Sequence, residues 1–167
     1  MDENPDEGLD QRQVIAFNSR GEFAQQLQAC IGRARRTLDL FDPDIALFNL
    51  GSSELDKVLR AFLMQGGRLR LAMHSTAHLE RECPRFIRLL RDLGHQVECR
   101  VTSRSLRQLT DSFCTGDDTD VVRRFHSDHA RGEAAFGVPG AADICRERFI
   151  GIWDESSVAL HPTTTGL

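Results

Sequence analysis

The sequence predicts a single α/β domain with a mixed sheet that is mainly parallel in its first four strands and is flanked by helices. Three observations lead to this prediction. The chain has 167 residues, the length of one domain. Up to residue 101, strand-like runs alternate with amphipathic helical runs, which is typical of α/β domains. Beyond that point two strand-like runs flank a short polar turn, which predicts an antiparallel hairpin near the C-terminal end.

The chain divides into a leader, one domain and a tail. Residues 1–12 are acidic and carry no apolar signal-peptide core, so we expect a flexible leader. The domain covers residues 13–157, and residues 158–167 form either a short edge strand or a disordered tail. No apolar run approaches the ~20 residues that span a bilayer, so we expect a cytoplasmic protein without a membrane span.

The first predicted unit is a strand, a helix and a second strand. Residues 13–17 form the strand, and the helix begins at a capping box of Ser19 and Glu22. The apolar face of that helix consists of Phe23, Leu27, Cys30 and Ile31. Residues 37–41 form the second strand, which ends at an Asp-Pro-Asp segment because proline cannot continue a ladder.

The second unit repeats this alternation. A helix is predicted to begin at a capping box of Ser53 and Asp56 and to end at a Gly-Gly pair. Its apolar stripe consists of Leu55, Val58, Leu59, Phe62 and Leu63. Residues 68–73 alternate with period two as a third strand. Pro84 suits the first turn of the next helix, and residues 95–101 form the fourth strand.

The C-terminal part predicts the hairpin and a final helix. Residues 109–114 and 120–125 are the two hairpin strands. A helix opens at residues 138–141. The side chains expected to point inward from it are Ile144, Cys145, Phe149 and Trp153.

The net charge and the basic residues indicate which classes of partner to expect. The net charge of -4 is unlike that of a general nucleic-acid binder, so nucleic acid is not an expected partner. Lys57 is the only lysine, and nearly all basic residues are therefore arginines, which suit phosphate recognition. Codon bias in a GC-rich genome explains this arginine content more simply.

No motif predicts a metal or a cofactor. The five cysteines form no C-x-x-C pair, and their odd number argues against a disulfide framework. His74 and His78 have the spacing of zinc ligands but lie near a strand end, which disfavours that interpretation. Asp117, Asp118 and Asp120 lack the spacing of a calcium loop and suit a turn.

One polar cluster leaves two interpretations open. His126 and His129, with an aspartate between them, could serve acid–base chemistry or hold a metal. A solvated loop between strands explains the same residues, and we favour it.

The order of the segments resembles one half of a phospholipase D-like fold. In that superfamily, stretches like ARRTLDLF (residues 34–41) and LLRDLGHQVECRV (residues 89–101) precede the strand that carries a His-x-Lys-x4-Asp motif. DSFCTGDDTDVVRR followed by RERFIGIWDESS is similar to a bacterial branch that lacks this motif, a domain of unknown function. In that branch a terminal F-x-x-x-W helix closes the domain, as Phe149 and Trp153 would here. The resemblance covers about residues 13–157.

The resemblance also locates a departure from the family. If Phe113 occupies the position of the aromatic after the motif lysine, Thr110 takes the histidine position, Ser112 the lysine position and Asp117 the aspartate position. Thr110 is a poor nucleophile without a base beside it, and Ser112 carries no charge to offset a phosphoryl group. The motif that family chemistry requires is therefore altered.

These observations give two hypotheses. The first is a non-catalytic phospholipase D-like domain that acts as a binding or assembly module for a phosphorylated ligand, which Arg100, Arg104 and Arg107 would contact at the strand ends. The resemblance implies a homodimer, because active single-motif relatives pair two copies. The alternative is a phosphodiesterase whose nucleophile is relocated to His126 or His129.

Overall fold

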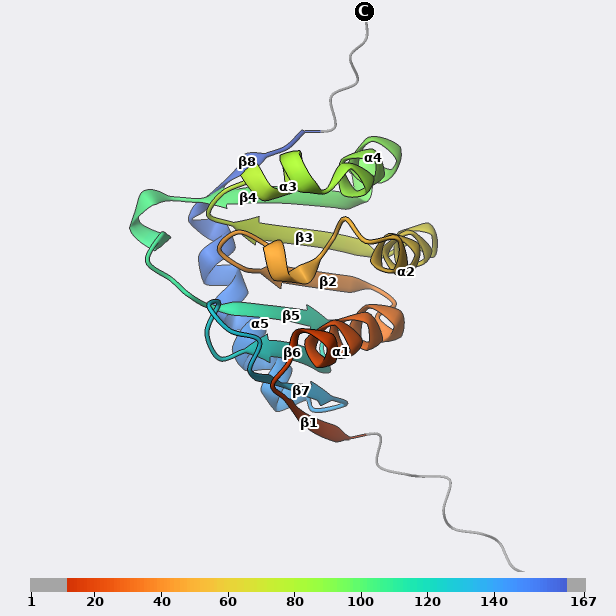
Figure 1. Ribbon diagram of the computed structural model, residues 1–167, viewed down its shortest axis with the longest axis vertical. Helices are drawn as coiled ribbons and strands as arrows, with labels where there is room; N and C mark the ends of the chain where they lie inside the picture. Colours follow the sequence, from red (N-terminus) through yellow and green to blue (C-terminus); the bar gives the residue numbers. More distant parts are fainter. Residues whose placement is uncertain (1–11, 162–167) are drawn as a thin grey trace, which may run out of the picture.

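The structure of the protein, a computed structural model, describes residues 12–161 (Figure 1). The leader predicted for residues 1–12 therefore lies, apart from its last residue, outside the described residues, as does the tail beyond residue 161.

The described chain alternates strands and helices as far as β4. The strands are β1 (Gln13–Phe17), β2 (Thr37–Phe41), β3 (Arg68–Met73), β4 (Val97–Thr102), β5 (Ser112–Gly116), β6 (Asp120–Arg124), β7 (Gly132–Phe136) and β8 (Ser156–Ala159). The α-helices are α1 (Arg20–Arg33), α2 (Ser53–Met64), α3 (Ala77–Glu82), α4 (Pro84–Leu93) and α5 (Pro139–Asp154). Short 3-10 turns cover Ala46–Phe48, Gly94–Gln96 and Arg104–Leu106.

All eight strands form one mixed sheet in the order β1-β7-β6-β5-β2-β3-β4-β8. The α/β domain with a mixed sheet and an antiparallel hairpin is confirmed. The prediction of a mainly parallel sheet is wrong, because only β2–β3 and β3–β4 are parallel neighbours and the other five pairings are antiparallel. The reason is long-range pairing: β1 lies at the far edge against β7, and β5 inserts beside β2.

The sheet separates two hydrophobic cores. Helices α1, α2, α3 and α4 cover one face, and α5 crosses the other, which no other described helix covers (Figure 1). Alternate residues of each strand point to opposite faces. In β2, for example, Leu38 and Leu40 join the larger core, whereas Phe41 joins the core beneath α5.

The predicted inward positions of α5 are confirmed with one exception. Phe149 and Trp153 are buried, and their rings stack with centroids 5.4 Å apart. Cys145 is also buried, but Ile144 is 73% exposed, so the prediction for Ile144 is wrong. The residues that α5 buries follow a stripe through Ala142, Cys145 and Phe149, and Ile144 lies about 100° away from it.

Two local predictions need correction. The N-cap of α2 is Ser52, whose hydroxyl accepts the N–H of Leu55, rather than Ser53, which is the first helical residue. Strand β7 was not predicted because it lacks β-branched residues. It depends on Gly132, where a Cβ would lie 2.0 Å from the carbonyl oxygen of Arg123 on the neighbouring strand.

Candidate functional site

A group of polar side chains lies at one end of the sheet, where β2, β3, β4 and β6 end and β5 begins. β2, β3, β4 and β6 run in the same direction, so their C-terminal ends meet at the edge where the antiparallel strand β5 starts. This edge is where open α/β sheets bind ligands. We call its polar residues the strand-end site: Asp42, His74, Thr102, Ser112 and Arg124.

Arg124 is the centre of the strand-end site. Its Nη2 donates to the Asp42 carboxylate in an ion pair whose two side chains are 2% and 1% exposed. Its Nε donates to the Ser112 hydroxyl at 2.9 Å. Its Nη1 donates to the carbonyl oxygens of Ser127 and His129 at 2.9 and 3.3 Å. Every nitrogen of this guanidinium therefore serves an internal partner.

Asp42 is satisfied in the same way. Its Oδ2 accepts the backbone N–H groups of Ile45 at 2.8 Å and Asp44 at 3.1 Å, and its Oδ1 accepts from Arg124. Burial raises the pKa of Asp42, while Ser112, the Arg124 charge and these two N–H groups oppose the rise. The arrangement is a closed pair of charges with no free base.

His74 links the sheet to the loop before β5. Its Nε2 lies 2.8 Å from the carbonyl oxygen of Leu109, and its Nδ1 lies 2.6 Å from the hydroxyl of Thr102. A carbonyl only accepts, so Nε2 carries the proton and Nδ1 accepts from Thr102. Both ring nitrogens are thus engaged, and the ring packs edge-on against Phe41.

The altered motif residues are divided between the two ends of β5. Thr110 is exposed just before the strand, and its carbonyl accepts the N–H of Ser127. Ser112 is buried against Arg124. Asp117 lies beyond the opposite end of this five-residue strand, ~17 Å away, and so does not join the strand-end site.

Asp117 fixes the turn of the hairpin to the segment before β2. Its Oδ1 accepts the N–H groups of Arg35, Arg36 and Thr37 at 3.2, 2.8 and 3.2 Å. Its own N–H donates to the Thr37 carbonyl, and its φ is 49°. This is an anchoring role that aspartate supports well, because it tolerates left-handed backbone and accepts several N–H groups.

The alternative nucleophiles, His126 and His129, lie on the loop between β6 and β7 with ring centroids 6.0 Å apart. Each Nδ1 accepts a backbone N–H, from Asp128 at 3.1 Å and from Arg131 at 3.2 Å. The neutral rings then carry their proton on Nε2, so no lone pair is free for attack on phosphorus. Any nucleophilic role would require one of these backbone hydrogen bonds to break.

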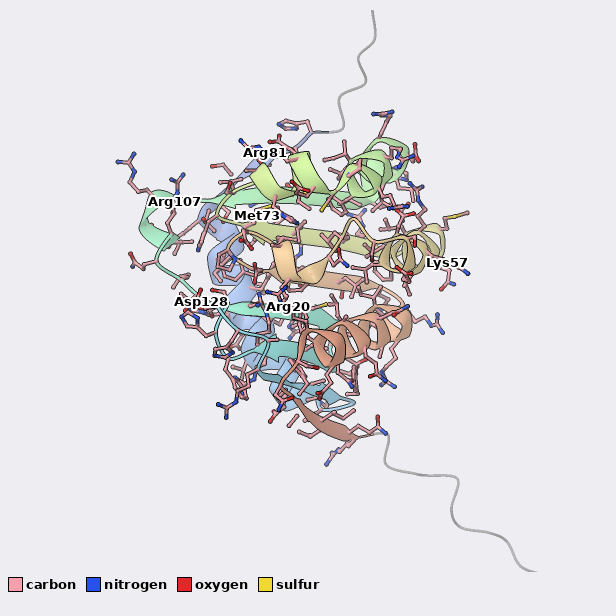
Figure 2. The ribbon with its side chains drawn as sticks, viewed as in Figure 1. Arg20, Lys57, Met73, Arg81, Arg107 and Asp128 are labelled. Atoms are coloured by element: carbon pink, nitrogen blue, oxygen red, sulfur yellow. The ribbon has the colours of Figure 1, made fainter. Side chains whose placement is uncertain are left out.

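The three arginines predicted to contact a ligand differ in how they are held. Arg100 donates to the Trp153 carbonyl and to Glu98, and its guanidinium lies 4.2 Å from the Trp153 ring centroid. Arg104 and Arg107 are exposed on the β4–β5 loop, and neither side chain bonds to the described residues. Figure 2 shows Arg107 at the outer tip of this loop.

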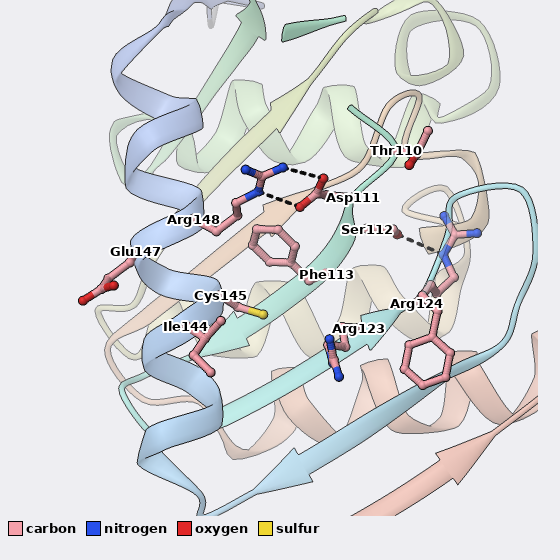
Figure 3. A pocket seen from close by; sticks show the side chains of 11 residues that line it. Thr110, Asp111, Ser112, Phe113, Arg123, Arg124, Ile144, Cys145, Glu147 and Arg148 are labelled. Atoms are coloured by element: carbon pink, nitrogen blue, oxygen red, sulfur yellow. Dashed lines mark hydrogen bonds and ion pairs between the residues drawn. The ribbon is translucent and has the colours of Figure 1, made fainter. Parts of the chain in front are cut away.

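A hollow of about 530 Å³ lies beside the strand-end site, between β5, β6 and α5 (Figure 3). We call it the α5-side hollow. It is lined by Thr110, Asp111, Ser112, Phe113, Arg123, Arg124, Phe125, Ile144, Cys145, Glu147 and Arg148. Arg148 crosses one wall and holds Asp111 through two hydrogen bonds of 2.8 and 2.9 Å.

Sequence reasoning identified Ser112 but missed its partners. From the sequence, the Asp-Pro-Asp segment that contains Asp42 is interpreted only as the end of a strand, and no role is assigned to Arg124. The pattern of β6 could have indicated that Arg124 is buried, because Val122 and Arg124 lie on the same side of the strand. A charged residue on the buried side of a strand requires a buried partner.

In the part of the chain that the structure describes, no group of three or more histidine, cysteine, aspartate or glutamate side chains is arranged to hold a metal ion. Within residues 12–161, none of the helices has both the length and the apolar character needed to cross a membrane.

Comparisons with known proteins place this geometry in context. Residues 19–161 match a family described as a domain of unknown function, DUF7931. No curated protein sequence matches the chain.

Solved structures share the fold. Nuc from Salmonella typhimurium, a phospholipase D family member, has a TM-score of 0.66 at 14% identity, over 89% of this chain and 98% of that one. NucT from Helicobacter pylori has a TM-score of 0.60 at 7% identity, again over 89% and 98%. TrmBL2, an archaeal chromatin protein described with a novel mode of DNA binding, has a TM-score of 0.67 at 11% identity. The match covers 88% of this chain but only 55% of TrmBL2, so the chain spans about half of its length. At these identities the comparisons show the fold alone, which is phospholipase D-like.

Proposed function

The chain belongs to the DUF7931 family of domains of unknown function, and we propose that it acts as a non-catalytic phospholipase D-like domain, a binding or assembly module for a phosphorylated ligand. Its setting in this proposal is the bacterial cytoplasm, as the sequence predicts.

The observation that carries the proposal is the closed ion pair of Arg124 and Asp42, with Ser112 bound to it. Phosphoryl transfer needs a nucleophile that can reach phosphorus and a cation that can reach the phosphoryl oxygens. Among the described residues, no imidazole or carboxylate is bonded to the Thr110 hydroxyl, and the guanidinium that is bonded to Ser112 serves internal partners. These contacts support a domain in which the residues at the altered motif have a structural role rather than a catalytic one.

Arg104 and Arg107 support the ligand part of the proposal. Both are exposed on the loop that joins β4 to β5 at the edge where α/β sheets bind ligands. A guanidinium binds phosphate oxygens through two parallel hydrogen bonds, which gives both affinity and orientation. The proposed contacts are therefore these two side chains, with Arg100 holding α5 in place through Trp153.

A homodimer is the second part of the proposal. Beside α5, the sheet face carries a hollow of about 510 Å³ whose lining includes Arg68, Arg70 and Glu98. Charges of both signs on one face allow self-complementary contacts across a two-fold axis. Sedimentation velocity should give a dimer mass, and Arg68→Glu should lower the dimer fraction. A monomer at all micromolar concentrations would contradict this part.

The ligand part is tested by calorimetric titration with glycerol phosphate. The double variant Arg104→Gln and Arg107→Gln should bind about tenfold more weakly or worse, because two charge-assisted contacts are lost. The matched control is Arg88→Gln with Arg91→Gln, exposed arginines of α4 whose side chains bond to none of the described residues. Equal binding by both double variants, or no binding by the wild type, would contradict the proposal.

A further inference from the structure

The α5-side hollow lies on the opposite face of the β5–β6 ladder from the Arg124–Asp42 pair. Ser112 pairs with Arg124 across this ladder, and the next pair is Phe113 with Arg123. Because successive residues of a strand point to opposite faces, the first pair faces α1 and the second faces α5. The hollow is therefore centred on the opposite face of the ladder from the buried ion pair, although Thr110, Ser112 and Arg124 also contribute to its lining, and the proposed function does not use it.

Part of the apolar lining of the hollow is exposed to solvent. Phe113 and Cys145 form buried parts of the lining, at 3% and 9% exposure. Phe125 and Ile144 line it as well, yet they are 53% and 73% exposed. Large apolar side chains left in water at the rim of a hollow of this volume are typical of small-molecule sites.

One charge in the hollow has no partner. Three arginines line it, and two are engaged, Arg124 with Asp42 and Arg148 with Asp111. The Arg123 side chain makes no hydrogen bond or ion pair with the residues that the structure describes, and its guanidinium lies 5.4 Å from the Phe125 ring centroid. Figure 3 shows the Glu147 carboxylate on the far side of α5, directed away from the hollow. The lining thus offers an available cation next to an exposed aromatic ring.

We propose that the α5-side hollow is a second ligand site, which binds a small molecule that joins an anionic group to an aromatic body. Arg123 binds the anion, a phosphate or a carboxylate, through its guanidinium fork. Phe125 and Ile144 cover the aromatic body and lose their exposed area to it. The hydroxyl of Thr110, at the margin of the hollow, is a further donor to the anion.

The test is an NMR titration of the isotopically labelled full chain with phenyl phosphate, with benzoate as the carboxylate arm. Amide shifts should move around Arg123, Phe125 and Ile144 and saturate. Inorganic phosphate and benzyl alcohol, which each carry half of the ligand, should bind at least about tenfold more weakly. Arg123→Gln should weaken phenyl phosphate binding about tenfold or more, as expected for a lost charge-assisted hydrogen bond. Phe125→Ala should also weaken it, and both positions are exposed enough for the variants to fold.

The outcomes separate this site from the one proposed at Arg104 and Arg107. Loss of binding in Arg123→Gln, with binding kept in the Arg104→Gln and Arg107→Gln double variant, supports the second site. Loss in the double variant alone overturns it and leaves the proposed function standing. Equal affinity for inorganic phosphate and phenyl phosphate also overturns it, because the aromatic half would then contribute nothing. So do shifts confined to residues outside the hollow.

Discussion

Arg124 and Asp42, which lie 82 residues apart in the sequence, form an ion pair inside the protein at the shared end of β6 and β2. The pair holds the β6–β7 loop through the carbonyl oxygens of Ser127 and His129, and it orients Ser112 on β5. It therefore fixes the end of the sheet at which β2, β5 and β6 meet. Buried charges are stable only when they are paired, so substitutions of either residue should measurably lower the stability of the protein.

Removing one partner of the pair should be costly. Arg124→Met leaves the Asp42 carboxylate buried without its counter-charge, so we expect the free energy of unfolding to fall by about 3–5 kcal/mol. Urea unfolding followed by circular dichroism measures this loss.

A double variant separates the charge from the packing. In Asp42→Asn with Arg124→Met neither charge of this pair remains, and the Asn oxygen can still accept the N–H of Ile45. The double variant should therefore be less destabilised than the sum of the two single variants by about 1 kcal/mol or more. Additive effects would show that the two side chains do not interact.

Asp117 should act as a structural anchor. Asp117→Ala removes the acceptor of three backbone N–H groups and should lower the free energy of unfolding by about 1–2 kcal/mol, the range for losing a side chain that caps N–H groups. The neighbouring Asp118→Ala is the matched control. Asp118 makes only exposed ion pairs with Arg146 and Arg36, which are worth under about 1 kcal/mol. Equal losses in the two variants would contradict the anchoring role.

Trp153 should be a major contributor to the core beneath α5. It is 6% exposed, stacks on Phe149 and lies under Arg100. Trp153→Ala should cost about 3–5 kcal/mol in chemical denaturation. On the same helix, Ile150 is 43% exposed, and Ile150→Ala should change stability by about 0.5 kcal/mol or less. A Trp153→Ala protein that unfolds at the wild-type urea midpoint would rule out this contribution.

Stability should fall at alkaline pH because of buried thiols. Burial, with a smaller effect of Glu98, raises the pKa of Cys99 to about 12, and burial also raises the pKa of Cys83 and Cys145. The folded thiols keep their protons, whereas the unfolded chain releases them above the ordinary thiol pKa of about 8.5. The stabilisation is therefore complete below that pH and is lost progressively as the pH rises toward 12.

The composition allows the effect of the buried thiols on stability to be measured with little interference from other titrating side chains. The chain has no tyrosine and a single lysine, so few other side chains titrate in the same range. Between pH 7.5 and 10 the urea midpoint should drop, because the free energy of unfolding falls by about 1.4 kcal/mol per pH unit for each raised thiol once the unfolded thiol is ionised. Cys99→Ala should flatten the decline. A midpoint that stays constant to pH 10 in the wild type would contradict the buried-thiol account.

The sequence predicted what local patterns determine. The capping box at Ser19, the proline at the start of α4 and the β5–β6 hairpin depend on neighbouring residues, and all three were recognised. The partner of β1 could not be recognised, because pairing with β7 joins residues more than a hundred positions apart. A mainly parallel sheet was predicted for the same reason: alternation of strands and helices does not show where a later strand inserts.

The candidate site was predictable only in part. The altered motif located Ser112 at the edge of the sheet where the strand-end site lies, because Ser112 begins β5 and Thr110 lies just before it. The ion pair escaped prediction because Asp42 and Arg124 meet only when β5 inserts between β2 and β6. Arg123 and Phe125 were not predicted as ligand-binding residues, because they become candidates only through their exposure in the fold, which residue type does not show.

The most direct test of the central claim is hydrolysis of bis-p-nitrophenyl phosphate by homogeneous protein, with an active phosphodiesterase as the positive control. General acid–base help alone accounts for only ~10²–10⁴-fold in rate, far less than enzymatic phosphodiester cleavage requires. We predict no turnover above background for the wild type, and none for His126→Ala or His129→Ala. Turnover that survives successive purification steps and is abolished by His126→Ala or His129→Ala would contradict the account and establish the relocated nucleophile instead.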